Sequence, residues 1–152
     1  MRSMELFFVN TGIVALLLLI YVTGVFFVSR LTRDNSVMDI AYGPAFLFAS
    51  GGALLLTEMY APLPAVVVGC IAAWAIRLGS RIFRKNLGKP EDARYAKWRE
   101  EWQTRGRWYF WLRSYLQVNL LQVGIIFLIS LPAIVALTFP TALDARWLAA
   151  GF

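Results

Sequence analysis

The chain has 152 residues, of which 59% are hydrophobic and only 16% are charged, and its mean hydropathy is +0.61. These values exclude an ordinary soluble domain. The chain contains no His and a single Cys, Cys70. We therefore expect no disulfide framework and no metal site, and the lack of His excludes histidine-based triads, zinc-protease motifs and haem ligation by His.

Four stretches of the chain carry no charged residue. They cover residues 6–29, 40–57, 59–76 and 114–143. Each reaches the roughly 18 to 20 residues that a helix needs to cross about 30 Å of hydrocarbon. We predict an all-α, polytopic membrane helix bundle that forms one membrane domain over residues 1–152. Its spans are expected at about 6–29, 40–57, 59–80 and 114–138, with Pro132 and Pro140 dividing the last stretch into a span and an exit.

The net charge of +6 is distributed unevenly along the chain. Ten of the 15 Lys and Arg residues lie within residues 81–113, and Arg30 and Arg33 follow the first span. The opposite side would hold only Arg2 and Arg146. The positive-inside bias therefore predicts a multi-pass protein of the cell (inner) membrane with cytosolic loops at 30–39 and 81–113 and both termini non-cytosolic. Basic residues beside a membrane helix serve topology and anionic lipid first, so membrane lipid is an expected partner and nucleic acid is not.

The second and third spans carry small residues at every fourth position, which predicts a close-packed helix pair. These residues are Ala41, Ala45, Ala49 and Ala53 in one span and Ala65, Gly69 and Ala73 in the other. Arg77 and Arg81 continue the second ridge, so we expect both on the packed face. A charge at bilayer depth costs roughly 3 kcal/mol and usually faces a protein interior or a water-filled cavity. The alternative is that Arg77 extends to the cytosolic interface.

The loop at 81–113 contains a predicted short amphipathic helix. Gly88 and Pro90 mark its start, and Tyr95, Trp98 and Trp102 recur at helical spacing. We expect this helix to lie on the membrane surface. The aromatic run at residues 108–111 is typical of an interface belt leading into the last span.

Polar residues within the spans are the candidates for chemistry. Asp39 and Tyr42 are three residues apart and share a helix face, so an acid beside a phenol could polarise a carbonyl and donate a proton. The alternative is that Asp39 caps its helix. Tyr115, Asn119 and Gln122 share a face of the last span and either bind a neighbouring helix or face a ligand.

A basic cluster follows Trp74 on the third span. Arg77 and Arg81 lie on it at helical spacing, and Arg84, Lys85 and Lys89 extend the positive field. Such a cluster suits an anionic cofactor with several phosphates, or else serves topology and lipid headgroups. No glycine-rich phosphate motif is present, so side chains would have to hold a dinucleotide.

Three short motifs in order resemble one family. SVMDIAYG at 36–43 resembles the S-x-x-D-x-x-W-G opening of the bacterial DUF1295 proteins, which belong to the steroid 5-alpha-reductase-like membrane reductases. WAIRL at 74–78 resembles the W-G-x-R-L helix of that family, and EDARY at 91–95 resembles its E-D-x-R-Y loop. Gln117 and residues 131–132 fit the next span. The resemblance covers about residues 30 to 140.

The resemblance implies a membrane enzyme that uses NADPH to reduce a carbon–carbon double bond conjugated to a carbonyl, in an apolar enone or lipid substrate. Tyr42 stands where the family usually has Trp. The candidate catalytic residues carried over from the family are Asp39, Tyr42 and Trp74. The candidate cofactor-binding residues are Arg77, Arg81, Arg84, Lys89, Arg94 and Tyr95.

The family also has a second half with more helices and an R-H-P-x-Y motif that completes the cofactor site. This chain ends at Phe152 without it. It is expected to represent the N-terminal half of a reductase, to need a missing C-terminal half or a second subunit, and to be inactive alone. Two alternatives remain: a membrane methyltransferase of the isoprenylcysteine type, and a non-catalytic membrane protein whose basic loop binds lipid or a partner.

Overall fold

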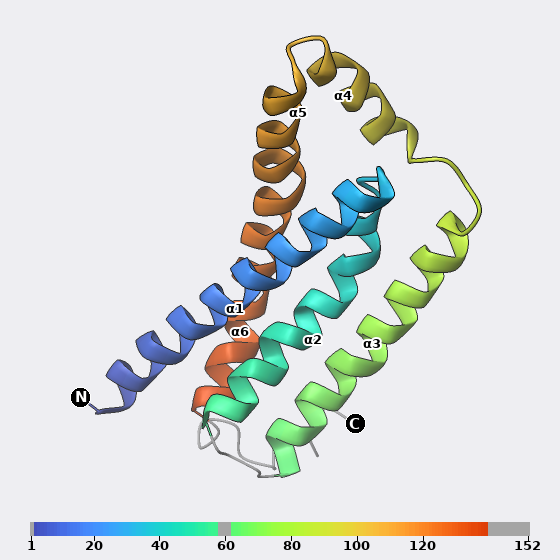
Figure 1. Ribbon diagram of the computed structural model, residues 1–152. Helices are drawn as coiled ribbons and strands as arrows, with labels where there is room; N and C mark the ends of the chain where they lie inside the picture. The colour runs from blue at the N-terminus through green and yellow to red at the C-terminus, as the bar shows by residue number, and fades with distance from the viewer. Residues whose placement is uncertain (1, 58–61, 140–152) are drawn as a thin grey trace.

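The computed structural model describes residues 2–57 and 62–139, and within these ranges it is helical, with no strand (Figure 1). The elements are α1 (Arg2–Thr32), α2 (Val37–Thr57), α3 (Pro62–Asn86), α4 (Ala93–Gln103), α5 (Arg107–Arg113), the π-helix η1 (Ser114–Leu120) and α6 (Leu121–Thr138). Four segments among them are long and apolar enough to cross a membrane: Met4–Thr32, Val37–Leu56, Pro64–Asn86 and Arg107–Thr138. The predicted all-α bundle and its four spans are confirmed. Pro140 and Arg146 lie outside the described residues.

The loop between α1 and α2 meets the loop and helix between α3 and α5 at one end of the bundle (Figure 1). Arg33, at φ 57°, ends α1 in the left-handed region, and the Asp34 amide donates to the Ser29 carbonyl over 3.1 Å. The Asn35 amide then donates to Glu91 Oε1 over 2.7 Å. The two loops predicted to share a side of the membrane therefore lie in contact.

The α2–α3 contact passes through Gly43, where a Cβ would lie 2.8 Å from the Ala75 carbonyl oxygen. Gly79 packs beside Pro44 at the same level. The predicted close approach of the two helices is confirmed, but the predicted ridges are wrong. On α2 the predicted ridge begins on the side that faces α1, because the carbonyl of Ala41 accepts a hydrogen bond from Tyr21 of α1.

On α3 the ridge of Ala65, Gly69, Ala73, Arg77 and Arg81 is exposed, so the arginines do not follow the packed face. Ala75 and Gly79, near the arginines in sequence, are buried instead. Both ridges have small side chains at helical spacing, and such spacing alone does not tell which ridge meets the neighbour. Because α2 approaches α3 closely at Gly43, the ridge that packs against α2 is the one with Ala75 and Gly79.

The predicted loop helix is present as α4, but it begins later than predicted: Pro90 precedes it, Asp92 is its N-cap, and the Asp92 carboxylate accepts from the Arg94 amide over 3.0 Å. Its aromatic face packs into the bundle. Tyr95 and Trp102 are buried in the protein core, and the rings of Trp98 and Trp102 stack with centroids 5.5 Å apart. The amphipathic pattern is therefore satisfied by tertiary packing against the bundle.

The aromatic run at 108–111 is divided between surface and core. Trp108 is highly exposed, as an interface belt requires, whereas Phe110 is buried. The guanidinium groups of Arg30 and Arg99 lie over the Phe110 ring, 4.6 and 5.0 Å from its centroid. Phe110 is therefore a core residue that packs beneath two cations, and the belt prediction is wrong for it.

Candidate functional site

An apolar cavity of about 340 Å³ lies between α2, α3 and α6. Aromatic side chains form one wall, since the rings of Tyr42 and Phe46 are 5.4 Å apart and those of Phe46 and Trp74 are 5.3 Å apart, both edge to face. Its lining residues are Tyr42, Phe46, Ser50, Ile71, Trp74, Ile129, Ser130 and Ala133. A cavity of this size and composition suits a small apolar molecule.

A polar cavity of about 250 Å³ lies between α2, α3 and the start of α4. Its lining residues are Asp39, Tyr42, Ile82, Lys85, Asn86, Asp92 and Arg94. Tyr42 lines both cavities and stands at their boundary. No hydrogen bond to its hydroxyl is found among the described residues, so the Tyr42 hydroxyl remains available to donate.

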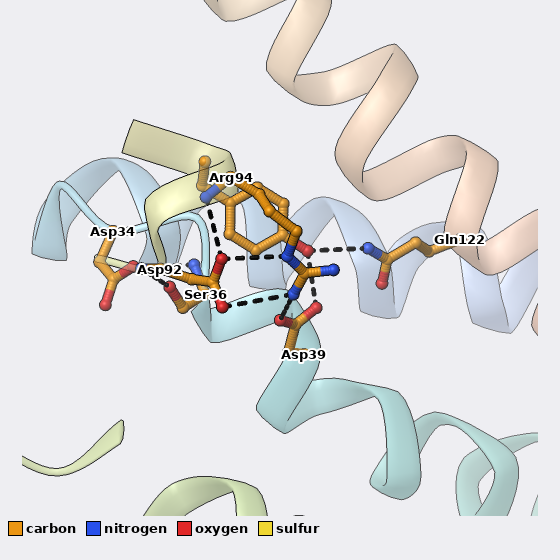
Figure 2. A network of polar contacts seen from close by, with 7 residues as sticks. Asp34, Ser36, Asp39, Asp92, Arg94 and Gln122 are labelled. Atoms are coloured by element: carbon orange, nitrogen blue, oxygen red, sulfur yellow. Dashed lines mark hydrogen bonds and ion pairs between the residues drawn. The ribbon is translucent and has the colours of Figure 1, made fainter. Parts of the chain in front are cut away.

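Asp39 is held by α4 and not by its own helix (Figure 2). Its Oδ1 accepts a 2.6 Å hydrogen bond from the Tyr95 hydroxyl and its Oδ2 a 3.2 Å bond from Arg94 Nη2. Gln122 Nε2 donates to the Tyr95 hydroxyl oxygen over 3.2 Å, which ties α6 to the same point. Asp39 lies in the first turn of α2 and is not its N-cap. The phenol beside this acid is therefore Tyr95.

Burial, followed by the hydrogen bond and negative charge of Asp39, raises the pKa of Tyr95 well above its ordinary value of 10.0. The phenol thus stays protonated at neutral pH and donates steadily to the carboxylate. Hydrogen bonds from Arg94 hold the pKa of the exposed Asp92 below its ordinary value. Asp92 is consequently ionised and keeps the Arg94 side chain beside the polar cavity.

A further ion pair fixes the loop that precedes α2, next to Asp39. Arg99 Nε lies 2.7 Å from Glu91 Oε2, and the two side chains are only 20% and 10% exposed. Arg99 Nη2 also donates to the Arg33 carbonyl over 2.8 Å, and the Asp92 amide donates to Ser36 Oγ over 2.9 Å (Figure 2). These contacts hold the start of α4 against the start of α2. They are therefore positioning contacts for the Asp39–Tyr95 pair.

The structure gathers some of the predicted site residues and not others. Asp39, Arg94 and Tyr95 form one hydrogen-bonded group, and Tyr42 lies beside it on the polar cavity. Trp74 lines the apolar cavity with Tyr42. The remaining predicted cofactor residues are exposed and line neither cavity: Arg77, Arg81, Arg84 and Lys89.

Sequence reasoning missed three residues that organise the site. Glu91 stood in the EDARY motif without an assigned role, and Arg99 gave no signal beyond the charge pattern of the loop, because their contacts with Asn35 and Arg33 join distant segments. Asn86 lines the polar cavity without any motif to mark it. Only the acids at the start of the predicted loop helix could have drawn attention to Glu91.

Ser130 is the one residue of the apolar cavity whose side-chain oxygen is buried without a hydrogen-bond partner within the described part of the chain. The residue is 4% exposed. Leaving a buried hydroxyl unpaired costs about 1–3 kcal/mol. Ser50, on the opposite wall, instead donates to the Phe46 carbonyl over 2.9 Å.

A protein-family model matches most of the chain. The model described as "Protein of unknown function (DUF1295)" matches residues 25–149. This chain belongs to the DUF1295 family. DUF1295 is linked to steroid 5-alpha-reductase-like membrane proteins, and the resemblance inferred from the three short motifs is confirmed at family level. No curated protein and no solved structure matches this DUF1295 chain.

Proposed function

We propose that this chain forms the substrate cavity and part of the cofactor surface of a membrane reductase. The enzyme uses NADPH to reduce a carbon–carbon double bond conjugated to the carbonyl of an apolar enone or lipid. The observation that carries the proposal is the place of Tyr42, which lines an apolar cavity on one side and a polar, charged cavity on the other. A conjugated enone has the same two parts, an apolar body and a polar carbonyl.

The apolar body of the substrate lies against Phe46 and Trp74 in this account. Their edge-to-face rings form one wall, and Ile71, Ile129 and Ala133 add aliphatic surface from α3 and α6. Burial of apolar ligand surface contributes roughly 25 cal/mol per Å². The expected substrate is therefore an apolar molecule small enough to fit the cavity of about 340 Å³.

Tyr42 donates to the carbonyl oxygen of the substrate. Two phenols lie near the cavities, and their hydrogen bonds distinguish them. The Tyr95 hydroxyl is committed to Asp39, whereas Tyr42 has no such bond among the described residues. A donor aimed at a carbonyl oxygen stabilises the negative charge that develops there during reduction. Asp39 acts indirectly, because it accepts hydrogen bonds from Tyr95 and from Arg94, which lines the polar cavity.

The basic side chains of α3 have the positive charge and the hydrogen-bond donors that would bind the phosphates of NADPH. Lys85 lines the polar cavity, and Arg81 lies four residues before it and seven after Trp74, so all three share one helix face. Among the described residues, no carboxylate pairs with Arg77, Arg81 or Arg84. These guanidinium groups are suited to bind phosphate. NADPH, when bound, would supply the hydride.

The same proposal also predicts how the site is oriented in the membrane and what its exposed arginines contact. The end of the bundle that carries α4 faces the cytosol, where NADPH is available, and both termini lie on the other side. In this proposal the exposed arginines contact a second subunit that completes the cofactor site. Lys89 and Arg94 contribute positive charge at the rim, although Arg94 is largely occupied by Asp39 and Asp92.

The exposed arginine ridge also favours one other function. A row of exposed Arg residues beside a membrane span binds anionic lipid headgroups, and a non-catalytic lipid-binding protein would need nothing more. The two functions differ in the ligand and in the need for the two cavities. A methyltransferase differs from both because it would bind S-adenosylmethionine.

The test is a titration of the detergent-purified chain with NADPH, S-adenosylmethionine and anionic-lipid micelles in parallel. The double variant Arg81→Ala with Lys85→Ala should weaken NADPH binding at least about tenfold, because charge-assisted hydrogen bonds contribute about 1.5–3 kcal/mol each. The matched control, Arg105→Ala with Arg107→Ala, removes the same charge at exposed positions away from both cavities. Saturable binding of S-adenosylmethionine alone, or of lipid alone, would contradict the reductase proposal.

A further inference from the structure

We propose that the outer face of α5, η1 and α6 binds an anionic phospholipid. Arg105 and Arg113 hold the phosphate of the headgroup, and an acyl chain lies in an apolar groove deeper along the same span. The site is separate from both cavities, and the inference does not depend on the proposed reductase. Its ligand is one chemical class, a phospholipid whose headgroup carries a net negative charge.

Two guanidinium groups converge on one phenolic oxygen at the start of the last span. The Tyr109 hydroxyl accepts from Arg113 Nε over 3.0 Å and from Arg105 Nη1 over 3.3 Å. Both groups lie over the Tyr109 ring, and Arg113 Nη1 also donates to Gln117 over 3.3 Å. Both arginines are exposed, and no carboxylate among the described residues forms an ion pair with either. Their remaining donors therefore form a cationic pair that suits a phosphate group.

The cationic pair lies at the depth where headgroup phosphates are expected. The candidate span Arg107–Thr138 runs continuously through α5, η1 and α6 (Figure 1). Arg113 is the last charged residue in it, because residues 114–143 carry no charge. Trp108 and Trp111, between the two arginines in sequence, are exposed, and exposed Trp at the end of a span is typical of the membrane interface. The pair therefore stands beside the headgroups, on the side where anionic lipid attracts basic segments.

A shallow apolar groove of about 560 Å³ continues from the cationic pair along the same span. It begins at Leu116, three residues beyond Arg113, and extends past Gly124 to Leu128. Gly124 keeps the groove open, because nothing lies within 4 Å of the position that its Cβ would take. An acyl chain that hangs from a phosphate at Arg113 would enter this groove. The groove suits any lipid chain, and the two arginines select a headgroup of negative charge.

Charge complementarity favours a lipid over a second copy of this chain. In a two-fold symmetric dimer the same patch would meet itself. Arg105 and Arg113 of one copy would then face the same residues of the other, and such like charges repel. An anionic headgroup instead neutralises both guanidinium groups, so we take the occupant to be a phospholipid.

Native mass spectrometry of the detergent-purified, delipidated chain tests the cationic pair. The probes are dioleoylphosphatidylglycerol, which is anionic, and dioleoylphosphatidylcholine, which has the same acyl chains but no net charge. The wild type should bind the anionic lipid at least about tenfold more tightly, and Arg105→Gln with Arg113→Gln should remove that preference. The matched control is Arg33→Gln with Lys97→Gln, which removes the same charge at exposed positions of the same end of the bundle.

The groove is tested by Gly124→Leu, which fills it from a position with open space and leaves the packing between helices intact. This variant should weaken binding of dioleoylphosphatidylglycerol about tenfold, because part of the acyl chain loses its apolar contact. Binding of dihexanoylphosphatidylglycerol should not change. Gly124 lies 11 residues beyond Arg113, or about 16 Å along the helix, and six-carbon chains end before it.

Three results would overturn the inference. Equal binding of the two dioleoyl lipids by the wild type, or an equal loss of the preference in the control variant, would mean that no specific headgroup site exists at Arg105 and Arg113. Displacement of the lipid by an equal concentration of inorganic phosphate would mean that the pair binds free phosphate and not a lipid. Unchanged binding of dioleoylphosphatidylglycerol by Gly124→Leu would mean that no acyl chain occupies the groove.

Discussion

The Tyr95 hydroxyl donates a 2.6 Å hydrogen bond to Asp39 Oδ1 across 56 residues of sequence. Through this bond the loop helix α4 is fastened to the first turn of α2, at the edge of the polar cavity. The bond joins two of the three motifs on which the resemblance to the family rests, SVMDIAYG at 36–43 and EDARY at 91–95. Each of these two motifs thus supplies one half of a single contact.

Tyr95→Phe is expected to lower the free energy of unfolding by about 1–3 kcal/mol. The change leaves the Asp39 carboxylate and the Gln122 amide without their shared partner while the ring itself stays packed. An unfolding titration of the detergent-solubilised chain with dodecyl sulfate measures the loss. Tyr109→Phe is the control, because its hydroxyl binds only the exposed Arg105 and Arg113, and its effect should stay within about 0.5 kcal/mol.

Stability should fall as the pH rises above about 10, the ordinary pKa of tyrosine. The folded state raises the pKa of Tyr95, so it favours the protonated phenol. That contribution is fully present below pH 10.0 and is lost as the pH rises toward the folded-state pKa. Tyrosinate absorbance provides the measurement. The difference between wild type and Tyr95→Phe should show no ionisation at pH 10, and an ordinary titration there would contradict the geometry.

The spans could be predicted from sequence because a charge-free run of sufficient length is a local property: α1 and α2 contain their predicted spans, whereas α3 continues to Asn86, past the predicted end at residue 80. The packed face of α3 could not be predicted from sequence, since Ala73 and Ala75 have the same small side chain. Which one is buried depends on Gly43 in another helix. The pairing of Asp39 with Tyr95 was hidden for the same reason, because the nearest phenol in sequence is Tyr42.

Gly43→Ala should destabilise the chain by about 1–3 kcal/mol, the usual cost of overpacking. A Cβ at this position would lie 2.8 Å from the Ala75 carbonyl oxygen, so α2 and α3 must separate. Gly69→Ala is the matched control, because nothing lies within 4 Å of its Cβ position and it is exposed on α3. Melting curves in detergent distinguish the two. A harmless Gly43→Ala would show that the helices do not meet there.

Removing one partner of the Glu91–Arg99 pair should be more harmful than a surface charge change. Glu91→Gln leaves a mostly buried guanidinium group without its carboxylate, which costs on the order of 3 kcal/mol. Glu100→Gln, at an exposed position of α4 next to Arg99, should change the free energy of unfolding by less than about 0.5 kcal/mol. A double-mutant cycle with Arg99→Met gives the coupling energy. Additive effects would mean that the pair does not hold the loop.

The central claim is that the Tyr42 hydroxyl, between the two cavities, binds the carbonyl of an apolar enone. Infrared difference spectroscopy of a carbonyl-labelled bicyclic enone bound to the purified chain tests it most directly. A hydrogen bond lowers the carbonyl stretching frequency, so the account predicts a lower frequency in the wild type than in Tyr42→Phe. An identical carbonyl frequency in the two proteins, with the enone bound to both, would contradict it.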